Sequence, residues 1–184
     1  EILRRLVGSE MCIRDSETNC QQNGIQVHWA QTTEEANSIV LNIARNADAK
    51  LAVKGKSMVS EEMELNHFLA ENGIEALESD LGEYIIQVDH ELPSHIIMPA
   101  IHKNREEISE VFQKKVAPAK KSDTAEEMTE TARQVLRDKF RRAELGISGV
   151  NFAVAETGTL CLVENEGNGR FCTTMPRVHI ALMG

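Results

Sequence analysis

The residues best suited to chemistry lie in short polar segments that follow apolar runs. In the first segment, Lys54, Gly55, Lys56 and Ser57 follow the apolar residues 51–53 and open a helical pattern. The start of a helix offers free N–H groups to an anion, and two lysines add positive charge. This pattern predicts that the two lysines and the serine bind a phosphate or carboxylate. Because the full phosphate-loop pattern is absent, the alternative is two solvated lysines beside a serine that caps a helix.

A second polar segment, residues 78–83, is rich in acidic side chains. Asp80 is suited to cap a short helix, whereas Glu83 has no such role and is a candidate ligand-binding residue. Two further candidates, His95 and His102, flank an apolar run that we predict to be a buried strand. A strand of about six residues at roughly 3.3 Å each keeps the two histidines too far apart for one metal ion, so we expect no metal site.

A third polar segment separates two apolar runs, 153–155 and 160–163, which predict short buried strands. Its residues are Glu156, Thr157, Gly158 and Thr159. The glycine allows a close approach of backbone to a ligand, so the whole segment is a candidate site. The alternative is a β-hairpin with ordinary turn chemistry.

The next turn, residues 165–170, contains two glycines that tolerate positive φ angles, and an arginine able to grip an anion. Its candidate ligand-binding residues are Asn165, Glu166 and Asn168. Parallel α/β sheets bind ligands beyond the carboxyl ends of their strands. We therefore expect the segments 54–57, 78–83 and 156–159 to form one cleft for a small carboxylate or another small anion.

The composition is that of a globular domain, because 41% of the 184 residues are hydrophobic and 27% are charged. The net charge of -9 disfavours nucleic acid as a partner. No apolar run of about 18 residues predicts a membrane span, and the start lacks a signal-peptide core, so we expect a cytoplasmic protein. The four cysteines show no Cys-x-x-Cys spacing, so we expect no cofactor, neither a zinc site nor an iron–sulfur cluster, within this chain.

Apolar periodicity places helices and strands in alternation along the chain. We predict helices over residues 33–47, 57–71, 81–88, 104–116 and 124–145. We predict strands over residues 51–53, 74–77, 93–102, 153–155, 160–163 and 178–183. This alternation predicts an α/β fold, with a layered, mostly parallel sheet flanked by helices.

The two ends of the sequence differ from the rest. Residues 1–16 do not fit the pattern of the later residues and resemble a translated adaptor, so we expect the domain to span residues 17–184. The apolar run at residues 178–183 leads us to expect that the domain belongs to a longer protein.

Taken together and in order, several motifs resemble the lactate utilisation protein B family, and the resemblance covers the chain from about Val27 to Gly184. The motifs are Lys54-Gly-Lys-Ser-Met58, Glu61-Glu62 with Leu65-Asn66, Glu78-Ser-Asp-Leu-Gly-Glu-Tyr84, Pro93-Ser-His-Ile96, Pro99-Ala-Ile-His102, Asn151-Phe-Ala-Val-Ala-Glu-Thr-Gly158, Asn165-Glu-Gly-Asn168 and Val178-His-Ile180. Ser79 stands where that family usually has threonine, and the acidic residues around it are kept.

The resemblance implies the domain shared by lactate utilisation proteins (the LUD domain), with a fold similar to the sugar-phosphate isomerase and coenzyme A transferase (NagB/RpiA/CoA transferase-like) superfamily. It also implies a subunit of a three-component system that oxidises L-lactate to pyruvate. In that system this subunit carries [4Fe-4S] clusters, which would lie in a ferredoxin-like segment after residue 184. The partners implied are the other subunits of the system.

Two hypotheses remain open. In the first, favoured by the resemblance, the domain is a docking or ligand-sensing part of an electron-transfer subunit, and catalysis by this chain alone is not expected. In the second, the domain is itself an enzyme that acts on a small carboxylate or acyl-thioester. Glu156 would then be the catalytic nucleophile or base, and Lys54 or Lys56 would supply its basic partner.

Overall fold

The computed structural model describes residues 2–95, 98–117, 124–164 and 166–184, and the side chains from residue 10 onward. Asn165 and the residues just before the long helix, 118–123, therefore lie outside the described residues. The helical elements are α1 (Ile2–Gln22), α2 (Thr33–Asn46), α3 (Met58–Glu62), α4 (Leu65–Glu71), α5 (Leu81–Asp89), α6 (Arg105–Val111), the π-helical turn η1 (Phe112–Val116), α7 (Ala125–Arg142) and α8 (Asn168–Thr174). The strands are β1 (Leu51–Lys54), β2 (Glu75–Glu78), β3 (Leu145–Gly149), β4 (Phe152–Val154), β5 (Thr159–Cys161) and β6 (Val178–Leu182).

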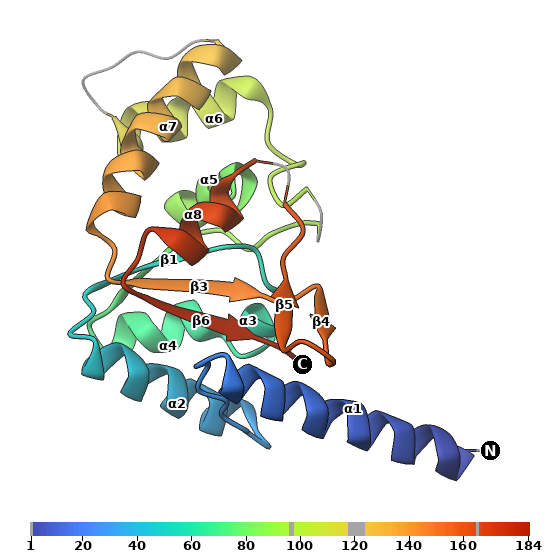
Figure 1. Ribbon diagram of the computed structural model, residues 1–184. Helices are drawn as coiled ribbons and strands as arrows, with labels where there is room; N and C mark the ends of the chain where they lie inside the picture. Colours follow the sequence, from blue (N-terminus) through green and yellow to red (C-terminus); the bar gives the residue numbers. More distant parts are fainter. Residues whose placement is uncertain (1, 96–97, 118–123, 165) are drawn as a thin grey trace.

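A four-stranded parallel sheet with the order β2-β1-β3-β6 forms the centre of the molecule (Figure 1). Val53 of β1 lies opposite Leu77 of β2 and Gly146 of β3, and Ile147 lies opposite Ile180 of β6. β4 and β5 form a separate antiparallel hairpin. The predicted α/β fold with a parallel sheet flanked by helices is confirmed.

Helices cover both faces of this sheet, and β1 and β3 are therefore buried on both sides. On one face, α2 and α4 pack against the sheet through a core that includes Val40, Leu41, Leu65 and Leu69. On the other face, the core includes Tyr84 of α5, Leu136 and Phe140 of α7, and Cys172 of α8. The ribbon shows the same layers, with α2 and α4 below the sheet and α5, α7 and α8 above it (Figure 1).

The predicted helices form where side chains satisfy their first N–H groups. Thr32 accepts from the N–H of Glu35 at the start of α2, and Asp80 accepts from those of Gly82 and Glu83 at the start of α5. Thr124 and Glu127 form a capping box at α7. The helix predicted over residues 57–71 is instead two helices, α3 and α4, because Glu64 takes a left-handed conformation between them.

Three strand predictions need correction. β3 was not expected, yet it lies at the centre of the sheet. The hairpin strands β4 and β5 are at most half-buried, so the expectation that they are core strands is wrong. In the predicted strand at 93–102, the described residues 93–95 and 98–102 form no strand but bends and turns. Pro93 and Pro99 lack the N–H groups that a strand needs, which favours this irregular path.

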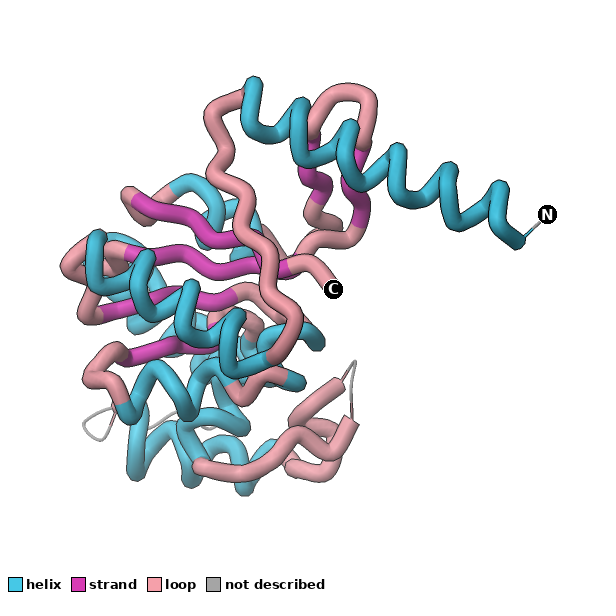
Figure 2. Tube along the Cα trace, turned by 90° about the horizontal axis from the view of Figure 1, so that it is seen from below, coloured by secondary structure: helices cyan, strands magenta, loops and turns pink. Residues whose placement is uncertain are grey.

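The end of α1 packs against the β4–β5 hairpin, while its first turns extend away from the body (Figures 1 and 2). Asn19 donates to the carbonyl oxygens of Ala155 and Glu156 at 2.8 and 3.1 Å. α1 is one continuous helix from residue 2 to residue 22. That residues 1–16 are foreign to the domain stays a prediction. None of the helices in the described part of the chain is both long and apolar enough to cross a membrane.

Candidate functional site

A buried ion pair joins the carboxyl ends of the neighbouring strands β1 and β2. Lys54, 1% exposed, places its Nζ 2.8 Å from Oε1 of Glu78 and donates to Oγ of Ser60 at 2.7 Å. Asn66 of α4 donates to the same Glu78 oxygen at 2.6 Å. Lys54 and Glu78 are register partners in the sheet, so the fold itself brings the two charges together. A lysine buried this way is held by its partners and offers its charge to a ligand only indirectly.

A second pair lies nearer the surface. Nζ of Lys56 is 3.4 Å from Oε1 of Glu83, which lies in the first turn of α5. Burial raises the pKa of the Glu83 carboxyl, and the nearby charge of Glu78 raises it further, while Lys56 opposes both effects. Burial also raises the pKa of Glu61 on α3, with the charge of Glu83 as the second cause. Two carboxyl groups close to each other are therefore easier to protonate than ordinary glutamates.

A small hollow of about 130 Å³ opens beside these carboxyls. Its walls are Glu61, Glu83, Pro93, Ser94 and His95. Nδ1 of His95 accepts a hydrogen bond from the N–H of Met98 at 3.1 Å, so its proton resides on Nε2 when the ring is neutral. The hollow is thus lined by groups that can donate or accept hydrogen bonds, close to one edge of the sheet.

His102 supports this wall from outside the hollow. Its Nδ1 lies 2.7 Å from Oγ of Ser94, and its Nε2 lies 2.8 Å from a carboxylate oxygen of Glu91. The structure therefore places the two predicted histidines in one irregular segment, with His95 at the hollow and His102 behind it.

Ser57 acts as a helix cap. Its Oγ accepts from the N–H of Ser60 at 3.3 Å at the start of α3, which is the alternative weighed for this residue. Both lysines of the turn are paired with carboxylates, so the segment does not present two unpaired positive charges. Anion binding at this turn stays a prediction.

The turn at residues 166–170 reaches the same region from the start of α8. Nδ2 of Asn168 lies 3.4 Å from Oγ of Ser79, at the end of β2. The Glu166 carboxylate accepts from the backbone N–H of Leu81, while burial and the charge of Asp80 raise its pKa. Gly167 has a φ of 83°, as its predicted turn role requires. Arg170 forms an ion pair with the carboxylate of Glu164, at 3.3 Å, and this partner belongs to the same chain rather than to a ligand.

The segment 156–159 is placed elsewhere. Asn23 donates to the carbonyl of Thr157 at 2.8 Å, and Gly158, at a φ of 63°, lies against the backbone of Asn19 and Cys20. Gly158 and Thr159 line a different hollow, which shares no lining residue with the first. Glu156 is exposed, and the lysines suggested as its basic partners are paired with Glu78 and Glu83. Three segments were expected to form one cleft. Segments 54–57 and 78–83 lie together, and the turn at 166–170 joins them, whereas segment 156–159 lies elsewhere.

Several site residues were not singled out as ligands from sequence, among them Ser60, Glu61, Asn66, Glu78 and Ser94. A signal existed for the first two: they lie three and four residues after Ser57, one helical turn away, so they share its face of the helix. Glu78 required the register between two strands, which the sequence does not state.

The chain is thus an α/β domain whose parallel sheet carries a polar cluster at its strand ends. The LUD domain family model matches residues 13–184, so the chain belongs to the LUD-domain family. The chain is 52% identical over 166 residues to lactate utilization protein B of Bacillus thuringiensis (strain Al Hakam), covering 90% of this chain and 35% of that protein. It is 50% identical over 163 residues to an uncharacterized electron transport protein, YkgF, of Escherichia coli (strain K12), covering 89% of this chain and 34% of that protein.

The chain thus spans about a third of the length of these curated relatives. No solved structure matches the chain.

Proposed function

We propose that this chain is the LUD-domain part of a cytoplasmic iron–sulfur electron-transfer subunit, in a multi-subunit system that oxidises L-lactate to pyruvate. The observation that carries the proposal is the 52% identity with lactate utilization protein B over 90% of the chain. The similarity to a protein named for electron transport supports the same role. The [4Fe-4S] clusters would be bound by a further segment of the full-length protein, in keeping with the roughly threefold greater length of the relatives.

Within that subunit, we assign the LUD domain the binding of a small carboxylate at the hollow beside Glu61 and Glu83. A carboxylate ligand there meets the carboxyl groups of Glu61 and Glu83, the second of which is paired with Lys56, so it binds well only when one glutamate is protonated. The raised pKa values of Glu61 and Glu83 make that protonation easier. Calorimetric titration with lactate or pyruvate should therefore show tighter binding at pH 5 than at pH 8, and Lys56→Ala should weaken it. Binding that is independent of pH and of Lys56 would remove this role.

The proposed function is tested by growth. In a Bacillus strain that lacks its lactate utilization protein B, a chimera of that protein carrying residues 17–184 of this chain should restore growth on L-lactate. Growth on glucose controls for general fitness. A chimera with Lys56→Ala tests the site, since the loss of that positive charge should weaken carboxylate binding and slow growth on lactate. Failure of a stably produced chimera to restore growth would contradict the proposal.

The alternative of a stand-alone enzyme requires a basic group beside Glu156. The structure commits Lys54 and Lys56 to other carboxylates, so no observation favours this alternative.

A further inference from the structure

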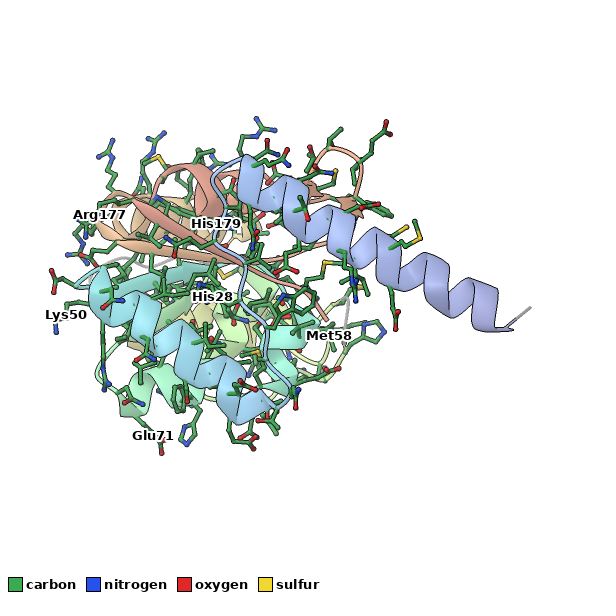
Figure 3. All side chains as sticks on the ribbon, turned by 60° about the horizontal axis from the view of Figure 1, so that its bottom comes forward. His28, Lys50, Met58, Glu71, Arg177 and His179 are labelled. Atoms are coloured by element: carbon green, nitrogen blue, oxygen red, sulfur yellow. The ribbon has the colours of Figure 1, made fainter. Side chains whose placement is uncertain are left out.

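One wall of the hollow beside α3 is Ser94, a serine whose hydroxyl is controlled by groups outside the hollow. Glu61 of α3 lines the same hollow. In Figure 3, Met58 at the start of α3 lies across the molecule from Lys50 and Arg177, which come just before β1 and β6. The hollow is therefore near the carboxyl ends of the strands, where parallel α/β sheets bind ligands.

A chain of hydrogen bonds runs from Glu91 through His102 to this serine. Nε2 of His102 lies 2.8 Å from one carboxylate oxygen of Glu91, and Nδ1 lies 2.7 Å from Oγ of Ser94. Lys103 donates to the other oxygen of Glu91 at 2.9 Å. The hydrogen bonds from His102 and Lys103 lower the pKa of the Glu91 carboxyl, so this group is ionised and can only accept.

The charge of Glu91 sets the direction of each bond in the chain. Because an ionised carboxylate cannot donate, Nε2 of His102 carries a proton, and in the neutral ring Nδ1 then accepts from the Ser94 O–H. The carbonyl oxygen of Pro99, 3.2 Å from the same Oγ, is a second acceptor for that proton. If His102 is protonated instead, its Nδ1 donates to Oγ and Pro99 receives the hydroxyl proton. In both cases the proton is held within the protein, and Ser94 presents lone pairs to the hollow.

A serine held in this way favours one kind of ligand oxygen. A hydroxyl group of a ligand can donate to Oγ of Ser94, whereas a keto oxygen can only accept and would face lone pairs. A site built to hydrogen-bond a ligand hydroxyl rejects an analogue that lacks it, because the group of the protein is then left unpaired.

The size of the hollow sets a second limit on the ligand. Its volume of about 130 Å³ is close to the roughly 150 Å³ of a cavity that holds one benzene molecule. The hollow therefore suits a ligand of about six non-hydrogen atoms, which is the size of L-lactate and of pyruvate.

We propose that Ser94 is a specificity-determining residue of this hollow, through which the domain binds a 2-hydroxy acid in preference to the corresponding 2-oxo acid. His102 is a positioning residue, because it acts on the ligand only through Ser94. The inference rests on the proposed function, in which the hollow binds a small carboxylate. It adds which of the two acids of the proposed reaction is held: L-lactate is retained and pyruvate is released.

Calorimetric titration of the full-length protein, separated from its partner subunits, tests the inference with L-lactate, pyruvate and propionate. Propionate has the same carboxylate but no oxygen at its second carbon, so it separates recognition of the hydroxyl from rejection of the keto group. We expect L-lactate to bind at least about fivefold more tightly than either of the other two acids. In Ser94→Ala the three affinities should come within about twofold of one another.

Two further variants separate a role in specificity from a role in structure. Ser38→Ala makes the same change on the exposed side of α2, where Oγ donates to the carbonyl of Glu34, and it should keep the wild-type ratio of affinities. His102→Phe keeps a ring but removes the nearer acceptor for the Ser94 proton, so it should lower the preference for L-lactate at least about twofold.

The outcomes distinguish this inference from the proposed function. Equal affinities for L-lactate and pyruvate in the wild-type protein, or a preference that survives Ser94→Ala, would overturn the inference and leave carboxylate binding in place. An unchanged preference in His102→Phe would overturn the role of His102. Binding of none of the three acids would overturn both the inference and the carboxylate role of the hollow, whereas growth on lactate tests the electron-transfer role separately.

Discussion

At the scale of single residues, the carboxyl ends of β1 and β2 are organised around the ammonium group of Lys54. Its side chain is 1% exposed and is held between Glu78 and Ser60. Breaking a buried ion pair by removing one partner leaves the other charge without compensation in a region of low dielectric. The stability of this corner of the sheet therefore depends on both charges being present.

We expect Lys54→Met to lower the free energy of unfolding by about 3–5 kcal/mol, because Glu78 is left buried and unpaired. Denaturant unfolding measures this loss. Lys56→Met is the matched control: its side chain is 29% exposed and 3.4 Å from Glu83, so its loss should be under about 1 kcal/mol. Equal losses for the two variants would show that the Lys54 pair is not buried in solution, and Lys54→Met combined with Glu78→Leu should recover much of the stability.

The raised pKa values of Glu61 and Glu83 predict a pH dependence with a definite sign. A carboxyl whose pKa is higher in the folded state binds more protons there than in the unfolded state, so stability falls as pH rises from the ordinary glutamate pKa of 4.5 through the folded pKa. The double variant Glu61→Gln, Glu83→Gln should flatten this fall in denaturant series at several pH values.

Asp89 supplies a control in a separate pH range. Hydrogen bonds from Lys103 and Lys115 lower its pKa from 3.8 to about 2. Its stabilising contribution is present above pH 3.8 and is lost as pH falls towards 2, so Asp89→Asn should lower the stability by a constant amount above about pH 4 and should change the slope of the curve only below it. For the double variant Glu61→Gln, Glu83→Gln, an unchanged slope of stability against pH above pH 4.5 would mean that Glu61 and Glu83 are solvated.

Sequence reasoning identified Lys54, Lys56, Glu83 and His95 as site residues because polar side chains at strand ends are conspicuous. The basic partner suggested for Glu156 was Lys54 or Lys56, whereas the structure pairs these lysines with Glu78 and Glu83. The sequence does not show which strand will lie beside Lys54. The pairing of Lys54 with Glu78 follows from the register of β1 and β2. The sequence thus singled out some of the polar residues in this region, but not the strand register that pairs their charges.

At the scale of elements, the strongest amphipathic patterns gave the best predictions. The buried residues of α7 include Met128, Ala132, Leu136 and Phe140, which is the stripe expected from 3.6-residue periodicity. The strand β3 was missed because its sequence, Leu145 to Gly149, contains two glycines and a serine, which usually indicate a turn. Tertiary packing explains the glycine at position 146, because a side chain there would collide with the carbonyl oxygen of Cys172 on α8.

The packing of α7 predicts a large cost for truncation. Phe140 is 7% exposed and meets the ring of Phe171 edge to face at 5.3 Å between ring centres. We expect Phe140→Ala to lower the free energy of unfolding by roughly 3 to 5 kcal/mol, measured by denaturant melts. Phe152→Ala, at a ring that is 64% exposed, should cost under about 1 kcal/mol. A loss below about 1 kcal/mol at Phe140 would mean that α7 is not packed as described.

At the scale of the whole molecule, the cysteines are dispersed. Cys12 is exposed halfway along α1, whereas Cys20 contacts the hairpin and Cys172 is buried on the inner side of α8. Burial raises the pKa of the Cys172 thiol to about 11, which disfavours the thiolate that iron requires.

We therefore expect the 184-residue chain to remain colourless after anaerobic incubation with iron and sulfide. The full-length protein treated in parallel is the control, and it should develop the visible absorbance of [4Fe-4S] clusters. A coloured 184-residue chain would contradict the assignment of the clusters to another segment.

The contact between α1 and the hairpin also bears on the order of folding. Asn19 and Ala155 are separated by 136 positions, so the hydrogen bond between them closes a very long loop. During synthesis at about 5–20 residues per second, Asn19 waits on the order of ten seconds before Ala155 is made. Local pairs such as β1 with β2 form long before that. The hairpin should thus dock late, and Asn19→Ala should accelerate unfolding while leaving the refolding rate nearly unchanged.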